Sequence, residues 1–115
     1  MGITGRLANK VVIVTGAGIR GEIAGTGQAT SILMAREGAK ILLADINFKR
    51  VQLTHLEIKK EGGESSIFIG DVTKEKDCKS MIEKCVQLYG RIDILFNNVG
   101  GFGRGSVVEI EEKDW

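Results

Sequence analysis

VVIVTGAGIRGEIAGTGQATSILMAREG, residues 11–38, is the stretch that decides the expected fold. Its first four residues, Val11 to Val14, form an apolar, β-branched run, which predicts a strand buried on both faces of a parallel sheet. A glycine-rich turn follows, and Gly38 stands where a helix ends on a left-handed residue. Between them lies a helical repeat made of Ala29, Ile32, Leu33 and Arg36, within a helix expected from Gln28 to Glu37. Strand, glycine turn and helix predict a mononucleotide-binding unit, in which a pyrophosphate rests at the positive end of the helix.

Two sets of glycines are candidates for the phosphate turn. Gly16, Gly18 and Gly21 match the pattern GxGxxG, which on its own is a weak signal. Gly25 and Gly27, on either side of Thr26, instead open the helix. A glycine-rich turn without a ligand is the plainest alternative.

The second set resembles the motif TGxxxGxG of the short-chain dehydrogenase/reductase family. Thr15-Gly16 and Gly25-Thr26-Gly27 match it, with about five extra residues around positions 19–24. The resemblance implies that the cofactor's phosphates lie near the turn residues Gly16, Gly18, Gly25, Thr26 and Gly27.

Composition excludes several classes of partner. The 115 residues carry 16 Lys and Arg against 15 Asp and Glu, spread evenly, so no field draws nucleic acid or an anionic membrane. No apolar run approaches the ~20 residues that span a bilayer, and residues 1–6 lack the apolar core of a signal peptide. We expect one cytoplasmic domain, preceded by a loose tail over residues 1–10, with Leu7 as its apolar anchor.

An acidic residue ends the second expected strand, Ile41 to Ala44. Asp45 can accept hydrogen bonds from both hydroxyls of an adenosine ribose, and its charge repels a 2′-phosphate. This favours NAD over NADP and places Asp45 and Ile46 at the cofactor. Arg20 is the one nearby residue that would instead support a 2′-phosphate.

The next helix is expected over Phe48 to Lys60, and the third strand over Ser65 to Gly70. His55, the only histidine, lies on the helix's apolar arc, which favours a packed side chain over a catalytic one. Asp71 and Val72 follow the strand. Asp71 is a candidate helix-start residue acting with Thr73, and the family resemblance also implies that this pair lies against the adenine ring.

A third amphipathic helix is expected over Thr73 to Tyr89. Its core stripe comprises Cys78, Met81, Ile82, Cys85, Val86 and Tyr89, and its solvent side Lys74, Lys76, Lys79 and Lys84. The two cysteines lie two turns, roughly 10 Å, apart and cannot form a disulfide. We interpret them as buried thiols, and we expect no metal site.

Ile92 to Phe96 is the fourth expected strand, and Asn97-Asn98-Val99-Gly100 follows it. This run resembles the NNAG motif of the same family, which implies that Asn98, Val99 and Gly100 pass along the cofactor's ribose.

The family resemblance runs from about Leu7 to Trp115. It implies an α/β, doubly wound, Rossmann-like parallel sheet with four strands in the order 3-2-1-4. Residues 1–115 would form a single NAD(P)-binding domain, truncated and incomplete at its C-terminus, whose full-length relatives are homo-oligomers. Because later strands are missing, we expect this chain to self-associate.

The implied function is the cofactor-binding portion of an oxidoreductase that transfers hydride between a nicotinamide and a carbonyl or alcohol. The family's catalytic Tyr, its Lys four residues on, and its Ser have no match, since the only tyrosine, Tyr89, is followed by Asp93 at the lysine position. We therefore expect no turnover by the chain alone. A non-catalytic dinucleotide-binding module is the alternative, and a methyltransferase is disfavoured by Asp71-Val72 and the NNVGG run.

Overall fold

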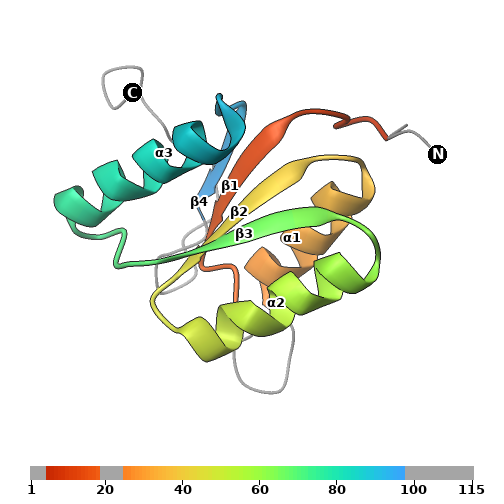
Figure 1. Cartoon of the computed structure of the whole chain (residues 1–115). Coiled ribbons are helices and arrows are strands. Elements are labelled where there is room, and N and C mark those ends of the chain that lie inside the picture. Colours follow the sequence, from red (N-terminus) through yellow and green to blue (C-terminus); the bar gives the residue numbers. More distant parts are fainter. Residues whose placement is uncertain (1–4, 19–24, 98–115) are drawn as a thin grey trace.

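The computed structural model describes residues 5–18 and 25–97. Strands and helices alternate along this part of the chain (Figure 1). They are β1 (Val11–Thr15), α1 (Thr26–Arg36), β2 (Lys40–Asp45), α2 (Phe48–Lys60), β3 (Glu64–Ile69), α3 (Glu75–Tyr89) and β4 (Ile94–Asn97). The bounds of α2 are those predicted, and the other elements differ from prediction by one or two residues at their ends.

The strands form one parallel sheet in the order β3-β2-β1-β4, so the predicted order is confirmed. In the register of the central strands, Val12 lies beside Ile41 of β2 and Ile94 of β4. Helices α1 and α2 cover one face of the sheet and α3 covers the other (Figure 1). Because all four strands run parallel, their carboxyl ends lie at one end of the sheet.

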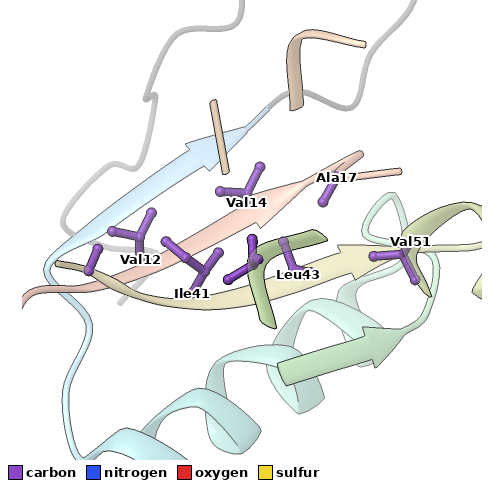
Figure 2. Packing of buried hydrophobic residues seen from close by; sticks show 8 residues of the cluster. Val12, Val14, Ala17, Ile41, Leu43 and Val51 are labelled. Atoms are coloured by element: carbon purple, nitrogen blue, oxygen red, sulfur yellow. The ribbon is translucent and has the colours of Figure 1, made fainter. Parts of the chain in front are cut away.

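The unbroken apolar runs of β1 and β2 arise because both faces of these strands are buried. Alternate side chains face the α1 and α2 layer, where Val51 and Ile58 complete a cluster with Val12, Val14, Ile41 and Leu43 (Figure 2). The intervening side chains meet α3 through Met81 and Cys85. Strands that alternate between two buried faces cannot include a polar position without a partner, which explains the absence of one from Val11 to Val14.

The buried face of α1 differs from the predicted stripe. Ala29 and Leu33 are exposed, Leu33 by 57%, whereas Gly27, Gln28 and Ser31 are buried. Ser31 remains satisfied within the helix, because its hydroxyl donates to the Gly27 carbonyl oxygen at 2.7 Å. Ile32 of the predicted stripe does pack against the core, together with Met34 and Ala35, so the prediction is wrong at Ala29 and Leu33 but confirmed at Ile32. The predicted left-handed residue after this helix is confirmed, with Gly38 at φ 97°.

Individual residues of α2 and α3 also depart from expectation. Phe48 was placed on the apolar arc but is 49% exposed, while Thr54 is buried. On α3, Val86 is exposed, and Lys84 leaves the solvent side to donate from Nζ to the Ile67 carbonyl oxygen at 2.7 Å. A long aliphatic stem explains Lys84, since it lets the ammonium group reach the sheet edge.

Residues 5–10 are fastened to the fold, which corrects the expected loose tail for these positions. The Leu7 N–H donates to the Glu37 carbonyl oxygen at 2.9 Å, and the Leu7 side chain packs against the α1 and α2 layer. Gly5 lies so close to Glu37 that a Cβ would sit 2.1 Å from that carbonyl oxygen.

Candidate functional site

A pocket of about 220 Å³ lies at the carboxyl ends of β1, β2 and β3. Open α/β sheets bind ligands at this edge, beside the point where the strand order reverses. The lining combines a glycine turn, the end of β2 and the segment after β3. It consists of Gly16, Ala44, Asp45, Ile46, Gly70, Asp71, Val72 and Thr73. The structure thus brings together five of the residues predicted to contact a cofactor.

Asp45 is the acidic group of this pocket. It is only 8% exposed, and each of its oxygens accepts one backbone N–H: Oδ2 from Gly18 at 2.9 Å and Oδ1 from Asn47 at 3.0 Å. A carboxylate oxygen has two lone pairs, so each oxygen retains room for one further donor. Asp45 therefore keeps acceptor capacity on both oxygens at the wall of the pocket. The neighbouring Ile46 is 68% exposed and offers an apolar surface.

The turn after β1 depends on glycine at two positions. Gly16 has φ 62°, a left-handed conformation that glycine adopts without a steric cost. Gly18 lies beside Asp45 rather than in the lining, and a Cβ there would stand 2.6 Å from Arg50 Cβ. Sequence reasoning identified both glycines but had no signal for the contact between Gly18 and α2.

Helix α1 begins at Thr26, two residues earlier than predicted, with Gly25 as its N-cap. Gly25 makes no side-chain capping bond, and no acidic residue occupies the first turn. The first N–H groups of a helix have no partner within the helix and carry its positive dipole end. Gly25, Thr26 and Gly27 are therefore placed as an anion-binding helix start requires.

Asp71 opens a turn after β3. Its Oδ1 accepts from the Thr73 N–H at 3.0 Å and from the Thr73 hydroxyl, and these bonds lower the pKa of Asp71. Its own N–H donates to Asp77 Oδ2 at 2.8 Å. The predicted partnership with Thr73 is confirmed, but α3 begins only at Glu75, so Asp71 shapes the turn rather than capping the helix.

The remaining predicted contacts, Asn98, Val99 and Gly100, lie outside the described residues, as does Arg20. Next to them, Asn97 ends β4, and its Oδ1 accepts from the Thr15 hydroxyl at 2.9 Å. Sequence reasoning missed two pocket-edge residues, Thr73 as lining and Asn47 as a partner of Asp45. The signal for Asn47 was its place before α2, where its side chain accepts from the Arg50 N–H as an N-cap.

Other reactive side chains have packing roles away from the pocket. His55 is half-buried and its Nδ1 bonds Ser65 Oγ at 2.6 Å, as expected for a packed histidine. Tyr89 bonds the Ser66 hydroxyl at 2.7 Å, and burial raises its pKa. Burial raises the pKa of the Cys85 thiol to about 11, and both cysteines are free.

Two site classes are not found in the described part of the chain. Residues 5–18 and 25–97 contain no group of three or more His, Cys, Asp or Glu side chains arranged to hold a metal ion. None of the helices in these ranges has the length and apolar character needed to cross a membrane.

Known proteins are similar to this chain in sequence. The family model for short chain dehydrogenases matches residues 10–115. The 3-oxoacyl-(acyl-carrier-protein) reductase FabG of Thermotoga maritima is 36% identical over 110 residues, which cover 96% of this chain and 43% of that enzyme. The chain spans less than half the length of the curated relatives it matches.

Solved structures show the same architecture. A short-chain dehydrogenase/reductase from Burkholderia xenovorans superimposes with a TM-score of 0.83 at 35% identity, over 97% of this chain and 44% of that one. An NAD⁺-bound xylitol dehydrogenase superimposes with a TM-score of 0.74 at 35% identity, over 84% of this chain and 35% of that one. From the strand order, the pocket at the strand ends and these matches, we conclude that the chain belongs to the short-chain dehydrogenase/reductase family.

Proposed function

We propose that this chain is the cofactor-binding portion of an oxidoreductase that transfers hydride between a nicotinamide cofactor and a carbonyl or alcohol. The observation that carries the proposal is the pocket at the strand ends, with the buried Asp45 carboxylate in its lining. When bound, the nicotinamide supplies the hydride chemistry. The residues of this chain bind and orient the cofactor, and residues 1–115 act as a single domain for that purpose.

Each part of the dinucleotide has chemically suited residues. The adenosine is held by Asp45, Ile46, Asp71 and Val72, which supply two carboxylates and apolar surface around one pocket. The pyrophosphate is held at the start of α1 and along the preceding glycines, by Gly16, Gly18, Gly25, Thr26 and Gly27. The resemblance of the run after β4 to the family motif supports Asn98, Val99 and Gly100 beside the second ribose.

Asp45 favours NAD over NADP. Each of its oxygens retains one acceptor position, and the two hydroxyls of an unmodified ribose are donors. A 2′-phosphate is negatively charged at neutral pH and is repelled by the Asp45 carboxylate. Because the carboxylate is buried, little water lies around it to screen this repulsion. The NAD⁺-bound state of a similar dehydrogenase supports this choice.

The test is a titration of the purified chain with NADH and NADPH, followed by the fluorescence of the reduced nicotinamide. We expect tighter binding of NADH. Asp45→Ser should reduce the ratio of NADH affinity to NADPH affinity by more than about tenfold, because the charge-assisted bonds to the ribose hydroxyls and the repulsion of the 2′-phosphate are both lost. Glu83→Ser, which removes a negative charge from the exposed side of α3, serves as the matched control and should leave the ratio unchanged.

A second variant tests the helix start. Gly27 is a buried residue of the first turn of α1, so Gly27→Val should weaken both cofactors alike by placing a branched side chain there. Tighter binding of NADPH by the unaltered chain, or full binding by Gly27→Val, would contradict the proposal. A cytoplasmic location and a homo-oligomeric whole protein remain predictions beside it.

A further inference from the structure

The carboxylate of Asp45 is held by backbone N–H groups from two separate segments. Asn47 belongs to the same turn as Asp45, but Gly18 lies 27 residues away, in the glycine turn after β1. We infer that Gly18 is a positioning residue for cofactor selectivity. Its N–H holds the Asp45 carboxylate in the orientation that distinguishes NAD from NADP, and its lack of a side chain leaves the space that this orientation needs. This inference rests on the proposed function.

Space around Gly18 leaves no room for a side chain. A Cβ at this position would stand 2.8 Å from Asp45 Oδ2, 2.6 Å from Arg50 Cβ and 2.9 Å from the Arg50 carbonyl carbon. Real Cβ atoms do not approach other atoms this closely, so something must move. The Arg50 atoms belong to the backbone and stem of α2, whereas the carboxylate of Asp45 turns about single bonds. Rotation of the carboxylate relieves its own contact with the added methyl group, whereas the two contacts with Arg50 also require a shift of α2.

The glycine turn itself cannot move away to relieve the contact. Ala17, the preceding residue, is fully buried; its N–H donates to the Ala44 carbonyl oxygen at 3.2 Å, and its carbonyl oxygen accepts from the Thr54 hydroxyl at 2.8 Å. Thr54 belongs to α2 and Ala44 to β2, so the turn is tied on both sides. Helix α2 is capped at its start by the Asn47 side chain, which accepts from the Arg50 N–H at 3.0 Å.

The consequence is a defined defect in Gly18→Ala. The added methyl group displaces the Asp45 carboxylate and strains its bond to the residue 18 N–H, which disturbs the two acceptor positions needed by the ribose hydroxyls. The affinity for NADH falls, while NADPH, which does not use these acceptors, is affected less. The NADH preference therefore narrows although the charge of Asp45 is still present.

The decisive experiment is a double-mutant cycle with Gly18→Ala, Asp45→Ser and the pair together, titrated with NADH and NADPH. Gly18→Ala should narrow the affinity ratio by about tenfold, the effect of losing one charge-assisted hydrogen bond. When Asp45→Ser is already present, adding Gly18→Ala should not change the ratio of NADH affinity to NADPH affinity any further. The Asp45 carboxylate, through which Gly18 acts, is then absent. Gly63→Ala is the matched control. A Cβ at Gly63 would also be crowded, 2.8 Å from Ile58 Cγ2, but this residue lies at the amino end of β3, away from the pocket at the carboxyl ends of the strands.

A measurement without cofactor separates this inference from the proposed function. Amide hydrogen exchange at Gly18 should be slow in the unaltered chain and accelerate about tenfold in Asp45→Ser, because the Oδ2 acceptor is removed. An unchanged exchange rate of the Gly18 amide in Asp45→Ser overturns the inference even if NADH binds. So do additive effects of the two substitutions in the double-mutant cycle, or a ratio of NADH to NADPH affinity that Gly18→Ala leaves unchanged. Failure of the unaltered chain to bind either cofactor refutes the proposed function, and the selectivity role falls with it.

Discussion

Carboxylates hold backbone N–H groups at both ends of β1. At its carboxyl end Asp45 accepts from Gly18, and at its start Asp93 Oδ2 accepts from the Val11 N–H at 2.8 Å. The bond from Val11 and the ion pair with Arg91 lower the pKa of Asp93. Single residues thus fasten β1 and the turn after it to segments that are distant in sequence, one just before β4 and one at the end of β2.

Asp93→Ala should lower the free energy of unfolding by about 1–3 kcal/mol, because it leaves the Val11 N–H without its acceptor in a partly buried place. Urea unfolding followed by circular dichroism measures this. The control is Glu75→Ala, which removes the exposed pair with Lys79 at 3.8 Å and should change stability by less than about 0.5 kcal/mol. Equal effects of the two variants would show that the Asp93 bond does not stabilise the fold.

At the level of elements, α2 is connected to its neighbours by side chains from several positions. Thr54 bonds the turn after β1, His55 bonds Ser65 of β3, and at its C-terminal end Glu61 forms a bidentate ion pair with Arg36 of α1. The exposed ion pair contributes little on its own. The two partly or fully buried bonds therefore add to the packing of Val51 and Ile58, which holds α2 on the sheet.

His55 should make stability depend on pH in a defined window. Burial, and to a lesser extent Lys59, lowers its pKa from the ordinary value of 6.5, so the unfolded chain binds a proton more readily than the folded one. Stability is then lost as pH falls below about 6.5. Urea unfolding at pH 7.5 and 5.5 should show this loss in the unaltered chain and a smaller one in His55→Gln.

The window isolates His55, because the carboxylates with lowered pKa values titrate at lower pH. The ordinary values of Glu37, Glu61, Asp71 and Asp93 are 4.5 or 3.8. An identical pH dependence in His55→Gln and the unaltered chain would rule out the histidine as its source.

At the scale of the molecule, the two edges of the described sheet differ. At β3 the ammonium group of Lys84, which reaches over from α3, bonds the Ile67 carbonyl oxygen, and a charge held against an edge strand discourages pairing with another chain. Within residues 5–18 and 25–97, β4 pairs with β1 alone. β4 carries apolar side chains, among them the buried Leu95. Within the described part of the chain, no strand pairs with the backbone groups on its outer side.

We therefore expect the chain to self-associate through β4, with a sedimentation coefficient that rises with protein concentration. Leu33→Glu is the informative variant, since Leu33 is the most exposed apolar residue on α1. Association through the strand edge should survive this change, whereas association through the helical face should weaken. A single monomeric species at every concentration would refute the prediction.

The sequence by itself determined the bounds of α2 and the position of the acidic residues at strand ends. These follow from local signals: a doubly buried strand needs an unbroken apolar run, and parallel strands bring their carboxyl ends, with Asp45 and Asp71, to one edge. The resemblance to the family implied the strand order, which the structure confirms, and the expected cofactor.

Only the tertiary structure decided which stripe of α1 is buried, where the Lys84 ammonium group lies and how residues 5–10 are fastened. It alone also paired Gly18 with Asp45 and Thr54 with Ala17. These contacts join residues far apart in the chain, and they depend on how closely helices approach the sheet. That approach is set by the packing of all the elements together, so no local pattern of residues contains it.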